Sequence, residues 1–198
     1  MTWIQTYTNA AFDFENLEAN SICIEDIAHA LANQVRFNGH TRKFYSVAQH
    51  SWWVSKAMER TYTGKSDPEP LLVGLLHDAS EAYLGDCVRP LKQRLPEFQN
   101  LEAQVEALIW RKFDLTQAVP ECWAVVKKYD NAMLATERRD LLGKSPRDWT
   151  ELGIDPLHGV FVYPVSPERS EGLFLDRFHS LQQARYARFQ SFKNNDPF

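Results

Sequence analysis

Residues 71–86, LLVGLLHDASEAYLGD, decide the predicted fold. The stretch opens with the nearly continuous apolar run 71–76, which is too short to span a membrane and predicts a buried central helix over about residues 69–81. The end of this helix carries His77, Asp78 and Glu81. Burying such polar groups without partners costs about 2–7 kcal/mol each. The doublet His77-Asp78 therefore needs a partner, and a metal ion is one that satisfies both side chains.

Apolar residues at helical spacing predict further helices on both sides of this run. Ser46 and Gln49 form a capping-box pattern that starts the helix before it. Residues 1–20 are expected to form an irregular or short extended arm, and no convincing sheet is predicted. We therefore expect an all-α fold in one domain, 1–198, with a core over about 24–142 and a C-terminal loop and helix over 143–192. The other predicted helices cover about residues 24–35, 96–113, 121–142 and 166–192.

Composition narrows the classes of function. The chain has 198 residues, a formal net charge of −4 and a pI of about 5.9. No basic face for nucleic acid is apparent, although a few local cations can still attract a small anionic substrate. The three cysteines show no C-x-x-C spacing, and the N-terminus lacks a signal pattern. We expect a cytoplasmic protein with no nucleic-acid or membrane partner.

Four residues form the candidate metal site: His50, His77, Asp78 and Asp130. A lone histidine on an apolar helix face is usually a satisfied core residue, and an aspartate at a helix end is usually a cap. The doublet after the apolar run favours a metal instead. Two nitrogens and two oxygens suit Mn²⁺, Fe²⁺, Co²⁺, Ni²⁺ or Zn²⁺ better than Mg²⁺, which would accompany the substrate phosphates.

The sequence around these residues resembles that of known metal-dependent enzymes. The segment 77–86, HDASEAYLGD, resembles H-D-A-S-E-x-x-x-G-D of the bacterial 5′-deoxynucleotidases, and phage dATP triphosphohydrolases are similar. The segment 47–51, VAQHS, also matches the phage-type members. The pattern over roughly residues 24–142 looks like that of the HD-domain metal phosphohydrolases. This resemblance implies a helical bundle with the metal site at its centre, and a dimer or hexamer as the assembly.

The resemblance also implies catalytic roles for two acidic residues. Glu81 would orient or deprotonate a water molecule beside the metal, and its alternative is a glutamate on a helix surface. On a continuous helix it would share a face with His77 and Asp78. Asp86 would lie near the substrate sugar or assist the leaving group, and its alternative is an aspartate in a solvent-facing turn.

Four more residues are candidates for substrate binding. In the nucleotidases an Arg-Trp pair before the first metal histidine contacts phosphate and nucleoside, and here the pair is Arg36-Phe37. Phe37 keeps an aromatic plane but loses the indole donor, which puts base selectivity in doubt. Arg36 would clamp a phosphate through its planar guanidinium, unless the pair is an ordinary helix terminus. Lys92 would meet a phosphate, and Pro90 would form a wall of the base pocket.

The sequence thus predicts a metal-dependent hydrolase of deoxynucleotides in two versions. The preferred version is a deoxynucleoside triphosphate triphosphohydrolase that releases deoxynucleoside and triphosphate, in the host cytoplasm if the protein is phage-encoded. The alternative is a 5′-deoxynucleotidase acting on monophosphates. A non-catalytic nucleotide-binding scaffold and a hydrolase of signalling nucleotides rank below both. The triphosphate version is preferred because of the phage-like pattern and five basic residues: Arg36, His40, Arg42, Lys43 and Lys92.

Overall fold

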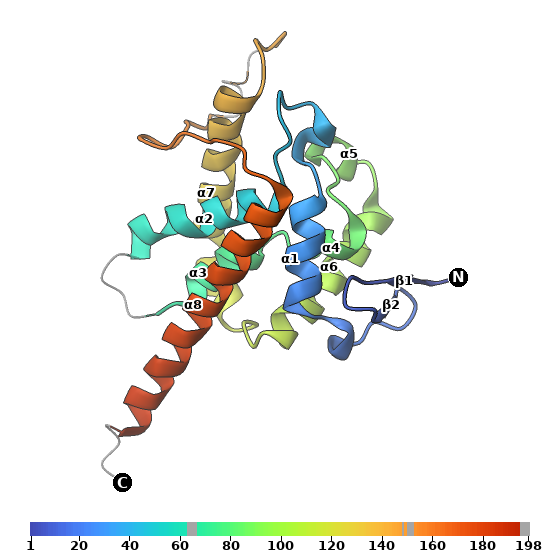
Figure 1. Ribbon diagram of the computed structural model, residues 1–198, viewed down its shortest axis with the longest axis vertical. Helices are drawn as coiled ribbons and strands as arrows, with labels where there is room; N and C mark the ends of the chain where they lie inside the picture. Colours follow the sequence, from blue (N-terminus) through green and yellow to red (C-terminus); the bar gives the residue numbers. More distant parts are fainter. Residues whose placement is uncertain (63–66, 148, 150–152, 195–198) are drawn as a thin grey trace.

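The computed structural model describes residues 1–62, 67–147, 149 and 153–194, and it confirms the predicted all-α class (Figure 1). Short 3-10 turns lie at Ala19–Ser21 and Arg36–Gly39. The helices are α1 (Ile24–Asn33), α2 (Val47–Tyr62), α3 (Glu69–Leu76), α4 (Glu81–Leu84), α5 (Arg89–Lys92), α6 (Pro96–Lys112), α7 (Ala118–Leu141) and α8 (Pro167–Asn194).

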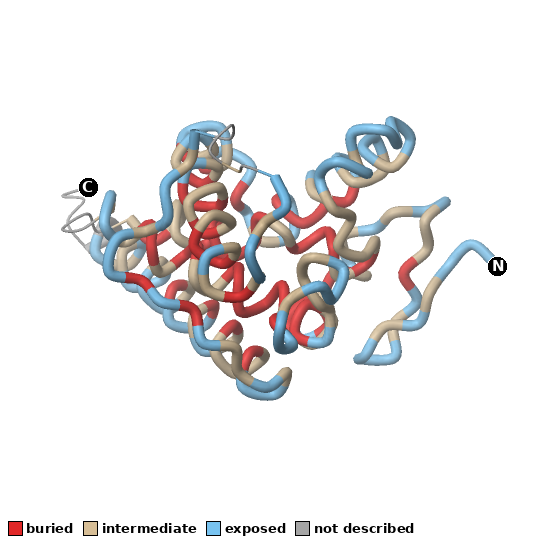
Figure 2. The backbone as a smooth tube through the Cα atoms, turned by 90° about the horizontal axis from the view of Figure 1, so that it is seen from above, coloured by how far each residue is buried: buried red, intermediate tan, exposed pale blue. Residues whose placement is uncertain are grey.

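Helix α3 is the central element, as its apolar run predicts. Leu72, Val73 and Leu75 are fully buried, and α3 packs against α2, α7 and α8. Gly74 lets α2 and α3 approach closely, because a Cβ atom there would collide with the sulfur of Met58. Figure 2 shows the buried residues gathered in the middle of the molecule, with exposed segments around them.

The predicted helix over 69–81 is wrong at its C-terminal end. Helix α3 stops at Leu76, and residues 77–80 form tight turns before α4 begins at Glu81. Two backbone hydrogen bonds between residues three positions apart mark these turns. Ala79 N donates to Leu76 O (2.9 Å), and Glu81 N donates to Asp78 O (3.0 Å). Successive side chains of a regular α-helix diverge by about 100°. The break allows His77 and Asp78 to point to the same place.

The expectation of no sheet is also wrong, because the N-terminal arm is a small antiparallel hairpin. Strand β1 (Trp3–Gln5) pairs with β2 (Ala11–Asp13), with Ile4 opposite Phe12. Thr8 at the turn donates to Asp26 of α1 through its backbone N (2.7 Å) and its hydroxyl (2.9 Å). The Phe12 ring is fully buried and stacks on Tyr83 at 4.2 Å. The hairpin is therefore attached to both α1 and α4.

The connection between α7 and α8 is held against the bundle by side chains of α2 and α7. The buried Gln49 donates through Nε2 to Tyr163 O (2.8 Å), and its Oε1 accepts from Val165 N (3.1 Å). Thr136 Oγ1 accepts from Leu157 N (2.8 Å). Helix α8 then packs across α1, α2 and α3. Across the described ranges, every helix falls short of the length or hydropathy needed to cross a bilayer.

Candidate metal centre

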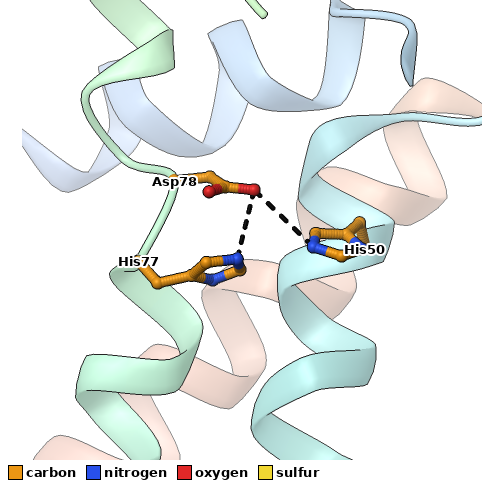
Figure 3. A group of neighbouring side chains, drawn as sticks. All are labelled: His50, His77 and Asp78. Atoms are coloured by element: carbon orange, nitrogen blue, oxygen red, sulfur yellow. Dashed lines mark ion pairs between the residues drawn. The ribbon is translucent and has the colours of Figure 1, made fainter. Parts of the chain in front are cut away.

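The structure brings three of the predicted metal ligands together around one point (Figure 3). His50 comes from α2, His77 follows the last residue of α3, and Asp78 lies in the turn after it. Oδ2 of Asp78 is 3.2 Å from His77 Nε2 and 3.6 Å from His50 Nε2. Because helix α3 ends at Leu76, the neighbouring residues His77 and Asp78 can both face His50.

Asp130 of α7 approaches the same two imidazoles. Its Oδ1 atom lies 3.3 Å from His50 Nε2 and 3.9 Å from His77 Nε2. An ion with bonds of about 2.0–2.2 Å separates neighbouring ligand atoms by roughly 3.0–3.6 Å. The distances that His50 makes to both carboxylates and His77 makes to Asp78 fall in this range, whereas the His77–Asp130 distance of 3.9 Å lies just outside it. His50, His77 and Asp78 therefore form a group that could hold a divalent cation, with Asp130 beside it.

The hydrogen bonds of both histidines select the ring form that binds metals. Nδ1 of His50 is 2.6 Å from Glu137 Oε1, and Nδ1 of His77 is 2.9 Å from Gly74 O. Because the partners are acceptors, Nδ1 keeps its hydrogen when the ring is neutral, and the Nε2 lone pair is then the one that can bind a metal. Both Nε2 atoms are buried, and neither has a hydrogen-bond partner within the described ranges. This chain's own residues thus fit a metal ion.

Electrostatics at the centre also favour a cation. Burial alone lowers the pKa of His77, but the charges of Asp78 and Asp130 outweigh it and raise the pKa to about 9. Burial alone raises the pKa values of both carboxyl groups, but the neighbouring histidines hold them well below their usual range. In the metal-free protein the carboxylates therefore retain a proton on His77, in the position that a metal ion would take.

Glu137 is a site residue that the sequence reasoning missed. It is fully buried on α7, and besides His50 it accepts a hydrogen bond from Tyr45 OH (2.8 Å). Its Oε2 lies 3.3 Å from Arg36 Nε. Carboxylates behind metal-binding histidines orient the ring and raise its basicity. The available signal was spacing, since Glu137 follows Asp130 by seven residues, or two helical turns.

Arg36 lies in the site, but the carboxylates of the protein already surround it. Its NH1 atom is 3.4 Å from Asp78 Oδ2, in addition to the Glu137 contact. Burial alone lowers the pKa of Arg36, but Glu137 and Asp78 outweigh burial and raise it. Phe37 follows with φ of 56°, in the left-handed region that aromatic residues rarely adopt. The predicted phosphate clamp therefore already faces two carboxylates of the protein.

Glu81 and Asp86 both lie near the predicted ligands, although Glu81 is on the separate helix α4. Glu81 is buried, and its Oε2 has no hydrogen-bond partner within the part of the chain that is described. Burial, with added repulsion from Asp78 and Asp86, raises the pKa of Glu81 well above its ordinary value. Burial likewise raises the pKa of Asp86, against an opposing effect of Arg36. Both carboxyl groups are therefore suited to carry protons.

Lys92 and Pro90, which were predicted to bind substrate, both lie on α5 but differ in their surroundings. Lys92 Nζ pairs with Glu102 Oε1 of α6 at 2.5 Å, so its charge is already matched. Pro90 is exposed. The structure therefore offers no independent support for a phosphate contact at Lys92 or a pocket wall at Pro90.

The sequence reasoning also missed two half-exposed cations, Arg89 and Lys127, which form the rim of the candidate centre beside Asp130. Arg89 NH2 lies 3.7 Å and Lys127 Nζ 3.6 Å from Asp130 Oδ2, with side chains 52% and 42% exposed. Nearby on α6, burial and the charge of Glu102 raise the pKa of Glu106 to about 7. No motif marks these residues, because their meeting depends on how α5, α6 and α7 pack.

Comparison with known proteins gives relatives along nearly the whole chain. No family model matches it. The uncharacterized protein RCAP_rcc00048 of Rhodobacter capsulatus is 28% identical over 187 residues, which cover 90% of this chain and 95% of that protein. The uncharacterized protein YfdR of Escherichia coli K12 is 36% identical over 186 residues, covering 93% of this chain and 98% of YfdR. The chain therefore belongs to the same protein family as YfdR.

Proposed function

We propose that this protein is a metal-dependent phosphohydrolase of the HD type that acts on deoxynucleotides. The observation that carries the proposal is the pair of buried, unpartnered Nε2 atoms of His50 and His77 facing the carboxylates of Asp78 and Asp130. A divalent ion bound there would act as a Lewis acid on a phosphoryl oxygen and make water a better nucleophile. The unpartnered carboxylate of Glu81 beside this centre favours hydrolysis over a purely structural site.

The proton transfers are assigned to Glu81 and Asp86. Water attacks the phosphorus bonded to the 5′ oxygen, and Glu81 accepts a proton from that water. The bond between this phosphorus and the 5′ oxygen breaks, and Asp86 supplies a proton to the departing oxygen. The raised pKa of Asp86, caused first by burial, suits it to supply a proton. The raised pKa of Glu81, also caused first by burial, makes its ionised form a stronger base. Glu137 and Arg36 act behind the centre by holding His50 and Asp78 in place.

The preferred substrate is a deoxynucleoside triphosphate. The resemblance of residues 47–51 and 77–86 to phage-type enzymes supports this choice. Arg89 and Lys127 add to the support, since both are partly exposed beside Asp130 and can meet further phosphates.

A monophosphate is the second candidate, and the pairing of two cations favours it. Arg36 already faces Asp78 and Glu137, and Lys92 already faces Glu102. Two of the basic residues that would hold extra phosphates are therefore neutralised by the protein itself. A 5′-deoxynucleotidase needs fewer cations than a triphosphohydrolase.

Product analysis separates these candidates. The purified protein is incubated with Mn²⁺ or Co²⁺ and each deoxynucleoside mono- and triphosphate, and the products are resolved by chromatography. We expect deoxynucleoside and triphosphate. Free phosphate from monophosphates alone would instead support the second candidate, and no turnover of any deoxynucleotide would support a non-catalytic scaffold.

The variant Asp78→Asn tests the centre itself. We expect it to abolish turnover and to lose bound metal, measured by elemental analysis, because it removes one of the two charged ligands. The control is Asp176→Asn, the same chemical change at an exposed residue of α8. Full activity in Asp78→Asn would contradict the proposed site.

A further inference from the structure

Gln34 lies at the end of α1, in a short extended segment that leads to the metal centre. Gln34 and Val35 both have extended backbone angles, with φ of −87° and −94°. Val35 forms an antiparallel bridge to the residue before α2. Side chains two residues apart in an extended chain point to the same side. Gln34 therefore shares a side with Arg36, whose guanidinium contacts Asp78 in the metal centre.

The side-chain amide of Gln34 bonds the backbone of Glu81, which lies 47 positions further along the chain. The Nε2 atom of Gln34 donates to Glu81 O at 2.7 Å. The same carbonyl accepts from Gly85 N at 2.8 Å, in the hydrogen bond that closes α4. Across the described ranges, no other side chain bonds the backbone of residues 77–85. Gln34 thus joins the end of α1 to the first residue of α4.

Helix α4 needs such support because it is short. It has four residues and follows directly on the tight turns of residues 77–80. A single helical turn is unstable by itself, since several backbone angles are fixed for few hydrogen bonds. Helix α4 packs against α1 (Figure 1), and Tyr83 stacks on Phe12 of the hairpin. These contacts hold the helix as a whole, whereas the bond from Gln34 holds Glu81 itself.

Packing alone does not explain a glutamine at position 34. The Oε1 atom of Gln34 is buried and has no hydrogen-bond partner in the part of the chain that is described. The amide cannot be reversed, because Glu81 O needs a donor and only the NH2 group of the amide provides one. A buried acceptor without a partner is unfavourable, so an apolar side chain of the same length would fill this space better. The hydrogen bond to Glu81 O therefore explains the amide.

We infer that Gln34 is a positioning residue, which holds Glu81 in the place from which it accepts a proton from the attacking water. The inference rests on the proposed function, in which Glu81 performs this step. Glu81 is buried, and among the described residues its Oε2 atom has no hydrogen-bond partner that would fix the carboxyl group. The position of this group therefore depends on where α4 places the backbone of Glu81, to which Gln34 is bonded.

A double-mutant cycle on the full chain with Mn²⁺ tests the inference, with dATP as substrate, or dAMP if only monophosphates react. Gln34→Met keeps the length of the side chain and removes both polar atoms. We expect kcat to fall about ten- to hundredfold, because a displacement of about 1 Å at a reacting group is costly. Metal content should stay unchanged. In the Glu81→Gln background the same change should lower kcat at most about twofold, since Gln34 acts through Glu81.

The control is Gln104→Met, the same chemical change at an exposed residue of α6. The amide of Gln104 bonds Asn100 O within its own helix. We expect kcat within about twofold of the unaltered protein, because exposed polar groups exchange readily with water. Thermal unfolding checks that each variant is folded, and Gln34→Leu replaces Gln34→Met if the latter fails to fold.

Hydrogen exchange in the metal-free protein gives a readout that needs no turnover. The amide of Gly85 bonds the carbonyl that Gln34 also bonds. Loss of the Gln34 bond should loosen α4 and speed exchange at Gly85 by up to about tenfold. Exchange along α6 should stay unchanged.

The outcomes separate this inference from the proposed function. An equal loss of kcat from Gln34→Met with and without Glu81→Gln would overturn the inference, because the effect would not pass through Glu81. Undiminished kcat in Gln34→Met, or unchanged exchange at Gly85, would overturn it as well. Absence of turnover by the unaltered protein would instead reject the proposed function, and the exchange at Gly85 would then decide whether Gln34 holds Glu81 in place.

Discussion

The inner wall and the outer rim of the metal centre differ in how their charges are paired. On the inner wall, His50 and Glu137 are fully buried, and Glu137 contacts a histidine, a tyrosine and an arginine within 3.3 Å. On the rim, Arg89 and Lys127 are about half exposed and approach Asp130 no closer than 3.6 Å. The wall is a buried network that holds His50 in place, whereas the rim cations are open to solvent and, in the proposed function, would exchange Asp130 for substrate phosphates.

This difference indicates which residues should determine metal binding and turnover, and which should determine the apparent affinity for substrate. Buried contacts in a low-dielectric interior are strong and tolerate little change. Exposed pairs are screened by solvent and contribute little to stability. We therefore expect variants of the wall to change metal binding and turnover strongly, and variants of the rim to change only the apparent affinity for substrate.

Among variants expected to keep the metal, the largest effect concerns Glu81, whose buried Oε2 has no hydrogen-bond partner within the described residues. Glu81→Gln keeps the shape but cannot accept a proton, so turnover should fall by about 10²- to 10⁴-fold. Metal content should remain that of the unaltered protein. Glu97→Gln, at an exposed position of α6, is the matched control. Undiminished turnover in Glu81→Gln would remove Glu81 from the proton transfer.

The next largest effect is a loss of metal affinity when Glu137 of the inner wall is changed. Glu137→Gln removes the negative charge behind His50 and beside Arg36, so metal affinity should fall by about 10- to 100-fold. Titration of the metal-free protein with Mn²⁺ or Co²⁺ measures this. Tyr45→Phe deletes one hydrogen bond to the same carboxylate and should have a smaller effect. If Tyr45→Phe and Glu137→Gln weaken metal binding equally, the charge of Glu137 is not what matters.

The pH dependence of metal binding follows from His77. Its pKa of about 9 in the metal-free protein means that below pH 9 a metal ion must displace a proton. Affinity should therefore rise with pH, by up to about tenfold per unit, and level off above about pH 9. Calorimetry in buffers of different ionisation enthalpy would count the released proton. A flat affinity between pH 6.5 and 9 would show that His77 is not a ligand.

The same pKa has an opposite consequence for the metal-free fold. The folded pKa of His77 is raised above its usual 6.5, so its proton stabilises the fold fully below about pH 6.5. This contribution is lost as the pH rises through about 9. Thermal unfolding of the metal-free protein at several pH values, with His77→Gln as comparison, would reveal it.

The smallest expected effect concerns the rim. Lys127→Ala should raise the KM for a deoxynucleotide by up to about fivefold, because a half-exposed cation interacts weakly in water. Metal affinity and kcat should stay unchanged. Lys128→Ala, the adjacent exposed lysine, is the control. A strong loss of metal from Lys127→Ala would show that this lysine belongs to the wall.

Much of the fold could be predicted from local pattern. The run over 71–76 identified the central helix, and apolar spacing located the long helices on both sides of it. The break after Leu76 and the N-terminal hairpin could not be predicted in the same way. Residues 77–84 are all compatible with a helix, and only tertiary contacts decide that the chain turns. The hairpin gains its stability from Asp26 and Tyr83, which lie far away in the sequence.

The candidate site also has a part that could be predicted from the sequence and a part that could not. His50, His77, Asp78 and Asp130 could be predicted to meet, because imidazoles and carboxylates on apolar helices need a shared partner when they are buried. The contact of Glu137 with His50 could not, because it depends on the angle at which α7 crosses α2. The pairing of Lys92 with Glu102 likewise depends on how α5 meets α6. Types of ligand can be inferred from sequence, whereas their supporting partners come from packing.

Gly74 shows how far such support extends. Its carbonyl orients His77, and its missing side chain leaves room for Met58 of α2, the helix that carries His50. A mutation to alanine would place a Cβ atom 2.3 Å from the Met58 sulfur, so the Met58 side chain would have to shift in the contact between α2 and α3. The packing around the candidate metal centre therefore depends on a residue that has no side chain and is none of its candidate ligands.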